Sequence, residues 1–252
     1  MRNEHDGPHA KIMTLRVKGR FGSLPGQFLH VRCSDETYPL LRRPFSVYTE
    51  RRAGKDTDVD ILYTIVGVGT RELSLMRRGD AVTIMGPLGK TFEDNPGADR
   101  LLMVAGGVGI VPFLIFSERL PRPDRIKLLF GGRTRQHLYG LKLFKKLGIE
   151  VGLATDDGSI GHKGFVTELL ERELACGGSV QVYTCGPEAM MERVIMIARK
   201  NGVPCMASLE KRMGCALGAC FACVTKVVDG DGWRYSRICI EGPVYDAAQL
   251  VL

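Results

Sequence analysis

Four cysteines near the C-terminus constrain this chain more than any other feature. Cys215, Cys220 and Cys223 follow the spacing Cys-x4-Cys-x2-Cys, and Cys239 comes after fifteen intervening residues. This is the ligand spacing of a plant-type [2Fe–2S] cluster, and it differs from the bacterial four-iron run. Small residues separate the ligands, and Gly218 can adopt positive φ, so the loop can bring backbone N–H groups close to cluster sulfurs. The pattern predicts a protein that transfers single electrons.

Two other interpretations of these cysteines stay open. Zinc usually binds two Cys-x2–4-Cys knuckles, whereas this chain supplies one clean knuckle and additional single cysteines. Structural disulfides are the third interpretation, and they are disfavoured because we expect no secretion signal at the N-terminus. The remaining cysteines have no metal-like spacing and are expected to be buried, reduced thiols: Cys33, Cys176, Cys185 and Cys205.

The composition is that of an ordinary globular protein. The 252 residues are 44% hydrophobic and 25% charged, and this length accommodates two domains with a smaller third unit. The net charge of +7 is spread evenly, which gives no support to nucleic-acid binding but suits anionic cofactors. The longest uncharged run, residues 101–117, is too short and too interrupted by glycine and proline for a membrane span. We expect a cytoplasmic protein.

The hydrophobic pattern changes along the chain. Residues 11–92 contain short alternating runs separated by turn residues, which predicts a small antiparallel barrel. From Arg100 onward, strand-like and helix-like segments alternate, which predicts a parallel sheet with helices on both faces. The last segment is short and rich in cysteine. The expected fold class is therefore all-β plus α/β, with an antiparallel barrel at 1–97, an α/β domain at 98–204 and a cluster module at 205–252.

The tetrapeptide Arg43–Ser46 is a candidate cofactor contact. An arginine can hold a pyrophosphate through two parallel hydrogen bonds, and a nearby hydroxyl can donate to a flavin oxygen. Alone, such a string more often marks an ordinary strand entrance. Its weight rises because Gly67-Val68-Gly69-Thr70 would present N–H groups and a hydroxyl to phosphate oxygens at a helix start, although a plain glycine turn is the alternative.

Two further loops follow predicted parallel strands. Gly106-Gly107-Val108-Gly109 opens a helix directly after a strand, which is the context of a dinucleotide-binding loop, although Pro112 departs from the strict motif. Cys185-Gly186-Pro187 also ends a strand and begins a helix. Because the carboxyl ends of parallel strands meet at one sheet edge, these loops are expected to converge on a ligand. A buried thiol is the alternative for Cys185.

The order of these motifs resembles the ferredoxin–NADP reductase superfamily. The stretch Ser208–Cys215 and the sequel Gly242-Pro243-Val244-Tyr245 after Cys239 closely resemble the electron-transfer subunits of class 1B dihydroorotate dehydrogenases. The resemblance implies FAD, one [2Fe–2S] cluster and NAD⁺ as the hydride acceptor. It also implies a separate FMN-containing catalytic subunit that oxidises dihydroorotate in pyrimidine (UMP) biosynthesis, in a heterotetramer of two copies of each chain.

The resemblance assigns roles to individual residues. Cys215, Cys220, Cys223 and Cys239 would bind the cluster, Cys185 would lie near the path of the hydride, and Ala216 stands where the family more often has glycine. Two rivals stay open: the reductase subunit of another flavin and iron–sulfur complex (hydrogenase, sulfide dehydrogenase or bifurcating type), and a zinc-stapled module. The preference between NAD and NADP stays open. The expected FAD contacts are Arg43, Pro44, Phe45, Ser46, Leu62, Tyr63, Thr64, Gly69 and Thr70, and the expected nicotinamide-nucleotide contacts are Gly106, Gly107, Gly109, Gly186 and Pro187.

Overall fold

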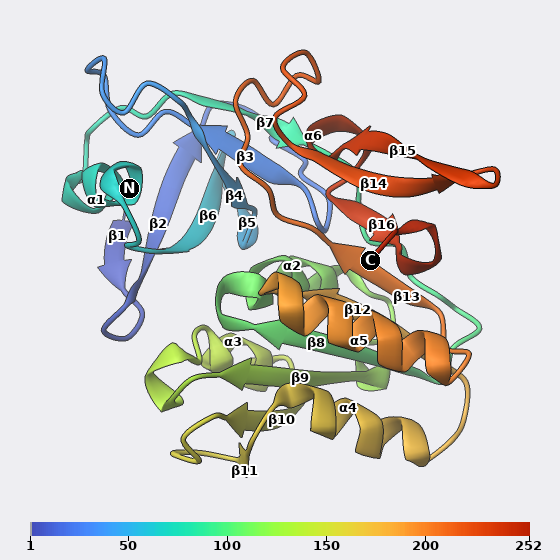
Figure 1. Cartoon of the computed structure of the whole chain (residues 1–252). Coiled ribbons are helices and arrows are strands. Elements are labelled where there is room, and N and C mark those ends of the chain that lie inside the picture. The colour runs from blue at the N-terminus through green and yellow to red at the C-terminus, as the bar shows by residue number, and fades with distance from the viewer. Residues whose placement is uncertain (1) are drawn as a thin grey trace.

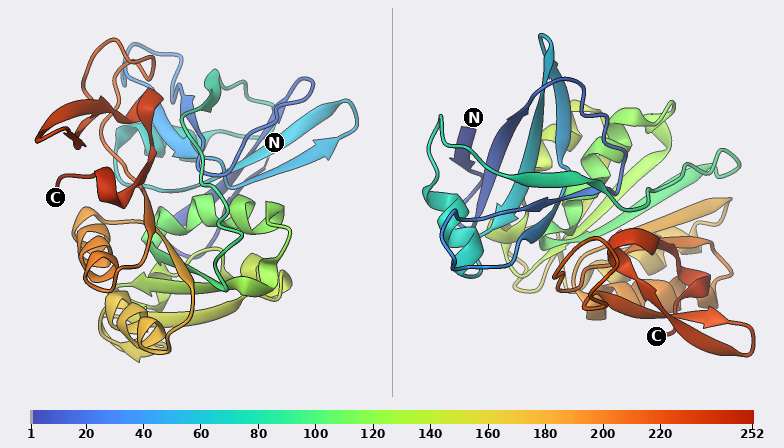
Figure 2. Two further views of the ribbon diagram at one scale, coloured as in Figure 1. Left: turned by 90° about the vertical axis from the view of Figure 1, so that its right-hand side faces the viewer. Right: turned by 90° about the horizontal axis from the view of Figure 1, so that it is seen from above.

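The computed structural model describes residues 2–252 and contains three units that pack against one another (Figure 1). An antiparallel barrel lies beside an α/β sheet domain, and a small C-terminal unit lies against both. Figure 2 shows from two further sides that the C-terminal unit sits where the barrel and the sheet domain meet. No helix among the described residues is long and apolar enough to cross a membrane.

Two antiparallel sheets form the barrel. Alternating side chains of its strands, including Met13, Leu29 and Ile61, fill the interior together with Leu73 of the short helix α1 (Val68–Leu75). The chain passes from one sheet to the other at Val47 and Tyr48, whose side chains are fully buried. The sheet orders are β1 (Arg2–His5), β2 (Ala10–Val17), β6 (Asp56–Thr64) and β5 (Thr49–Ala53), and then β4 (Arg43–Ser46), β3 (Phe28–Val31) and β7 (Ile84–Leu88).

A seven-stranded sheet forms the second unit, with helices on both faces. Leu102 and Val104 pack toward α4 (Val166–Ala175) and α5 (Glu188–Lys200), whereas Leu101 and Met103 pack toward α2 (Val111–Arg119) and α3 (Leu141–Lys146). This alternation is why β8 reads as a continuous apolar run. The strand order is β11 (His162–Lys163), β10 (Glu150–Thr155), β9 (Ile126–Gly132), β8 (Arg100–Gly106), β12 (Val180–Cys185), β13 (Cys205–Ser208) and β16 (Val244–Asp246).

The C-terminal unit holds the cysteine loop. It consists of the hairpin β14 (Val224–Asp229) and β15 (Gly232–Arg237), the short helix α6 (Ile238–Glu241) and strand β16. Strand β16 pairs antiparallel with β13, so the chain returns to the edge of the large sheet. The boundary expected at 204/205 assigns β13 to the cluster module, but β13 pairs in parallel with β12. We therefore propose that the cluster module begins after Ser208.

Backbone hydrogen bonds connect the three units. The N–H of Lys90, after the last barrel strand, donates to the carbonyl of Gly242 at 2.6 Å, and the N–H of Leu209 donates to the carbonyl of Pro243 at 2.9 Å. Gly89 packs against the same segment, since a Cβ there would lie 2.5 Å from Pro243. These contacts fix the linker between β13 and the cysteine loop against the barrel.

Candidate cofactor and nucleotide site

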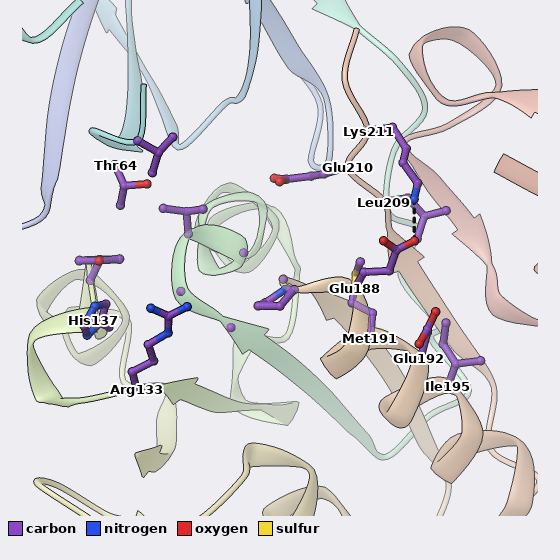
Figure 3. A pocket seen from close by; sticks show the side chains of 18 of the residues that line it. Thr64, Arg133, His137, Glu188, Met191, Glu192, Ile195, Leu209, Glu210 and Lys211 are labelled. Carbon is purple, nitrogen blue, oxygen red and sulfur yellow. Dashed lines mark hydrogen bonds and ion pairs between the residues drawn. The ribbon is translucent and has the colours of Figure 1, made fainter. Parts of the chain in front are cut away.

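Three neighbouring cavities meet where the barrel, the large sheet and the cysteine loop come together. The largest has a volume of about 810 Å³, and Figure 3 shows the side chains that line it. A second, of about 280 Å³, lies on the barrel side, and a third, of about 740 Å³, lies toward the cluster module. Within residues 2–252, Glu210 is the only ionisable residue that lines all three.

The cavity on the barrel side brings together every residue expected to contact FAD. Strand β4, the end of β6 and the first turn of α1 supply its wall. Arg43 is anchored because its Nη1 donates to the carbonyl of Leu41 at 2.6 Å. A Cβ at Gly69 would lie 3.3 Å from the Arg43 side chain, so glycine lets the arginine lie across the helix start. The assigned roles stay predictions, but the residues lie together as expected: Arg43, Pro44, Phe45, Ser46, Leu62, Tyr63, Thr64, Gly69 and Thr70.

The expected helix start after β6 is present. The Thr70 hydroxyl accepts hydrogen bonds from the N–H groups of Val66 and Gly67 at 3.0 and 3.2 Å. This hydroxyl therefore orders the turn that enters α1. In this structure Thr70 shapes the loop, in addition to lining the cavity.

The two glycine loops of the large sheet line the 810 Å³ cavity together. Gly106, Gly107 and Gly109 come from the turn after β8, and Gly186 and Pro187 from the turn after β12. A Cβ on Gly109 would lie only 2.2 Å from the carbonyl oxygen of Cys185. The two loops therefore approach so closely that only glycine fits at position 109. Close packing thus explains this glycine independently of any role in nucleotide binding.

Cys185 lies at the end of β12 and is 1% exposed. Burial raises the pKa of its thiol far above the ordinary value, with the Glu210 carboxylate as a smaller cause. Its neighbours Gly186 and Pro187 line the large cavity, but Cys185 is not among the described residues that do so. Its role beside the hydride path stays a prediction.

Glu210 belongs to the stretch Ser208–Cys215 that carries the resemblance, but no site role was assigned to it from the sequence. It lies in the linker between β13 and the cysteine loop, and Figure 3 shows its carboxylate pointing toward the space between the barrel and the sheet domain. The side chain is open to the cavities, yet the surrounding protein raises the pKa of its carboxyl by desolvation. The available signal was a lone acidic residue between a buried strand and the first cluster cysteine.

The cysteine loop is shaped around the sulfur of Cys215. The N–H groups of Leu217 and Cys220 donate to this sulfur at 3.3 and 3.4 Å. Gly218 has φ +80° as expected, and Ala216 and Phe221 also have positive φ, at 56° and 55°. Non-glycine residues adopt this region at a cost, which gives a physical reason for the glycine that the resemblance leads us to expect at the position of Ala216.

The donor set fits a two-iron cluster. Hydrogen bonds from Leu217 and then Cys220 lower the pKa of Cys215 to about 6, whereas burial raises the pKa of Cys239 to about 11. Cys220 is among the neighbours that lower the pKa of Cys215, and both Cys223 and Cys215 are among those that raise the pKa of Cys239. Four cysteine sulfurs brought to one region of the chain are the donor set of a two-iron cluster.

Comparisons with known proteins agree with this geometry. A family model described as the iron–sulfur cluster binding domain of dihydroorotate dehydrogenase B matches residues 210–251. Another, described as an oxidoreductase NAD-binding domain, matches residues 103–195. Both matches fall on the units that the sequence assigns to the cluster and to the nucleotide.

Two curated relatives match nearly the whole chain, and both are named dihydroorotate dehydrogenase B (NAD(+)), electron transfer subunit. The one from Desulforamulus reducens is 36% identical over 230 residues, covering 91% of this chain and 87% of the relative. The one from Caldanaerobacter subterraneus is 38% identical over 240 residues, covering 95% and 91%. Identity at this level and coverage shows common family membership.

Solved structures confirm the expected fold class. A structure of the NADH-dependent reduced ferredoxin–NADP oxidoreductase, described for flavin-based electron bifurcation, matches with a TM-score of 0.84 at 25% identity, covering 99% of this chain and 88% of that one. A ferredoxin–NADP⁺ reductase from Neisseria gonorrhoeae, with bound FAD and NADP, shares the fold with a TM-score of 0.61 at 19% identity, covering 79% and 88%. Together with its relatives, these neighbours identify the chain as an oxidoreductase subunit that belongs to the family of electron-transfer subunits of dihydroorotate dehydrogenase B.

Proposed function

We propose that this chain passes electrons from an FMN-containing dihydroorotate dehydrogenase catalytic subunit, through a [2Fe–2S] cluster and FAD, to NAD⁺ in pyrimidine biosynthesis. The observation that carries the proposal is the meeting of the three cavities at the linker 209–213. This linker joins the nucleotide-binding sheet to the cluster cysteines and also borders the flavin cavity. Three redox sites around one short segment suit a relay.

The barrel-side cavity is assigned to FAD, which when bound supplies the conversion between single-electron and hydride transfer. Arg43 offers its guanidinium to the pyrophosphate, and the first turn of α1 offers backbone N–H groups. Ser46 and Thr64 line the same cavity from β4 and β6. These side chains would hold FAD in the cavity when it is bound, and Val108 of the first glycine loop lines the same cavity.

The 810 Å³ cavity is assigned to the nicotinamide nucleotide. Gly106, Gly107 and Gly109 let the ligand approach the backbone, and Gly186 and Pro187 line the same cavity from the turn after β12. Cys185 remains the proposed neighbour of the hydride path, acting through the shape of this loop. A hydride transfer needs the two rings close together. The large cavity and the flavin cavity share Thr64, Val66, Val108 and Glu210 in their walls, which supports the proposal.

The cluster is assigned to Cys215, Cys220, Cys223 and Cys239. The N–H of Ile238 donates to the carbonyl of Cys223 at 2.9 Å, which holds Cys223 beside the segment that carries Cys239. Backbone donors to the sulfurs, as at Cys215, are the groups by which proteins adjust cluster potential.

The surface around the cysteine loop is the proposed contact with the catalytic subunit. Leu217 is 63% exposed and Phe221 is 54% exposed, and they flank the cluster ligands. On the adjacent hairpin, Trp233 and Tyr235 are half-exposed and pack edge to face with ring centroids 5.1 Å apart. Exposed apolar and aromatic side chains in one region are typical of protein interfaces. A heterotetramer of two copies of each chain is the assembly we propose.

The deciding experiment is co-expression with a candidate dihydroorotate dehydrogenase catalytic subunit. The purified complex is expected to reduce NAD⁺ with dihydroorotate, while this chain alone reduces artificial acceptors with NADH but does not oxidise dihydroorotate. Dihydroorotate oxidation by the isolated chain would contradict the division of labour. A complex that forms but reduces NAD⁺ only with another electron donor would favour the alternative, a reductase subunit of a different redox complex. The structural likeness of this chain to the bifurcating reductase is the observation behind that alternative.

A further inference from the structure

The large cavity extends from the glycine loops in two directions that differ in charge (Figure 3). One arm contains Arg133 and His137, and the other contains Glu188 and Glu192. Lys211 pairs with Glu188 at 2.6 Å, so the positive charge there is already matched. The pyrophosphate of a dinucleotide is doubly negative, so it is attracted to the arginine arm and repelled by the glutamate arm.

The outer wall of the arginine arm comes from the other unit of the molecule. His9, in the turn between β1 and β2 of the barrel, stacks on His137 with ring centroids 5.0 Å apart and an interplanar angle of 22°. Asp6 in the same turn accepts a hydrogen bond from the N–H of Gly140 at 2.8 Å. Thr134 fixes the His137 ring through a 3.0 Å contact with Nδ1. The hairpin turn is therefore held against the nucleotide-binding sheet by separate contacts.

We propose that His9 is a positioning residue for the adenylate half of NAD: stacked on His137, it forms the barrel's contribution to the wall of the arm in which Arg133 faces the pyrophosphate. The inference rests on the proposed function, because it takes the 810 Å³ cavity as the nicotinamide-nucleotide site. The nicotinamide then occupies the part shared with the flavin cavity, and the adenylate lies at the opposite end, between barrel and sheet.

The charges around the stack make it sensitive to pH. Burial, then His9 and Arg133, lower the pKa of His137, so its ring is neutral at neutral pH. Because the pKa is lowered, the neutral stack is intact above the ordinary histidine pKa and weakens as the pH falls below it. Two imidazolium rings at this separation repel each other. The groups that oppose protonation are His9 and Arg133, and the acidic groups nearby are Asp156 and Asp157 after β10 and Asp6 on the hairpin.

The test uses the FAD-loaded chain and isothermal titration with NAD⁺ and with ADP-ribose, which keeps the adenylate half but lacks nicotinamide. His9→Ala is expected to raise both dissociation constants by about three- to tenfold, the range of one lost aromatic contact. His5→Ala is the matched control, because it removes an exposed imidazole from the same hairpin outside the cavity. His9→Phe keeps a stacking ring, so it should retain affinity at neutral pH and reduce the loss of affinity seen in the wild type on acidification.

Other outcomes would overturn the inference. Unchanged NAD⁺ and ADP-ribose affinities in His9→Ala would show that the turn does not border the adenylate. Release of FAD by His9→Ala, with dinucleotide binding intact, would place the turn at the flavin instead. Tighter binding of NAD⁺ by the wild type in acid would mean that protonated histidines bind the pyrophosphate directly. That result would contradict the proposal that two neutral stacked rings form the wall. A wild type that binds no NAD⁺ would remove the proposed function as well, and it is recognisable because no variant is needed to see it.

Discussion

The glycine loops of the nucleotide cavity and the cysteine loop of the cluster module both contain small residues, but the two regions are ordered in different ways. In the nucleotide loops, Gly109 lies against the backbone of Cys185, and the surrounding residues are buried. In the cysteine loop, Ala216 and Phe221 adopt positive φ, and Cys220 is exposed. The first site is ordered by protein packing. The second depends on a metal cluster for part of its order, as small metal modules generally do.

The comparison predicts that substitutions in the nucleotide loops lower the stability of the whole fold, whereas substitutions in the cysteine loop affect cluster binding alone. The largest effect is expected for Gly109→Val, because its Cβ would lie 2.2 Å from a backbone oxygen that cannot move freely. Overpacking against backbone should lower the free energy of unfolding by about 3 kcal/mol or more and abolish NAD⁺ binding. Denaturant unfolding with a calorimetric titration measures both.

Gly107→Ala is the matched control for this prediction. Its φ is +55°, but a Cβ there meets open space. It should lower the free energy of unfolding by only about 1 kcal/mol, the cost of a left-handed residue. Equal destabilisation by both variants would mean that strain, and not the close approach of the loops, governs this region.

Cys220→Ser tests the opposite half of the comparison. The variant is expected to lose the iron–sulfur absorbance and EPR signal completely, while FAD stays bound because the flavin contacts lie in the barrel. Iron analysis and visible spectra measure the two cofactors separately. Cys176→Ser, at an exposed cysteine away from the loop, is the control and should keep both. Full iron content in Cys220→Ser would contradict the ligand assignment.

Arg43→Ala is expected to weaken FAD binding by about 2–3 kcal/mol, since a charge-assisted contact with the pyrophosphate is lost. Titration of the apoprotein with FAD gives the change. Arg42→Ala is the neighbouring control, because Arg42 donates to the carbonyl of Thr83 and is not among the described residues that line the flavin cavity. Similar losses of FAD affinity in both variants would indicate a general effect of removing positive charge, and not the loss of a specific contact between Arg43 and the pyrophosphate.

Much of the fold was predictable from the sequence where local patterns and tertiary environment agree. The alternation of strands and helices expected from Arg100 onward is present, with β8, β9, β10 and β12 in one parallel sheet and helix α2 after the first glycine loop. Within the region expected as a barrel, the residues after Arg43 belong to two strands of different sheets, because the chain changes sheets at Val47 and Tyr48. Periodicity gives the identity of a buried residue, but it does not indicate which sheet the residue joins.

The site was predictable where residues adjacent in sequence act together, as in the glycine loops and the cysteine spacing. Glu210 and the stack of His9 on His137 were not, because they depend on contacts between distant segments. A lone histidine in a turn carries no local signal for a partner 128 residues away. The pairing of β13 with β12 was missed for a similar reason, since the cysteines nearby suggested a separate module from residue 205.

The smallest predicted effect sharpens the comparison inside the cluster loop itself. Ala216 has φ +56°, a region that costs a residue with a Cβ about 1 kcal/mol or more, whereas glycine adopts it freely. Part of that gain is offset because glycine loses more chain entropy on folding, so Ala216→Gly should stabilise the apo loop by only about 0.5 kcal/mol. If the cluster supplies much of the loop's order, Ala216→Gly should retain its cluster longer than the wild type in excess chelator. The global free energy of unfolding should change little. Ala219→Gly, at a position without positive φ, is the control and should shorten retention. Cluster loss followed by visible absorbance in excess chelator distinguishes the two signs. Faster loss in Ala216→Gly would show that the strained backbone at Ala216 contributes to holding the cluster instead of opposing it.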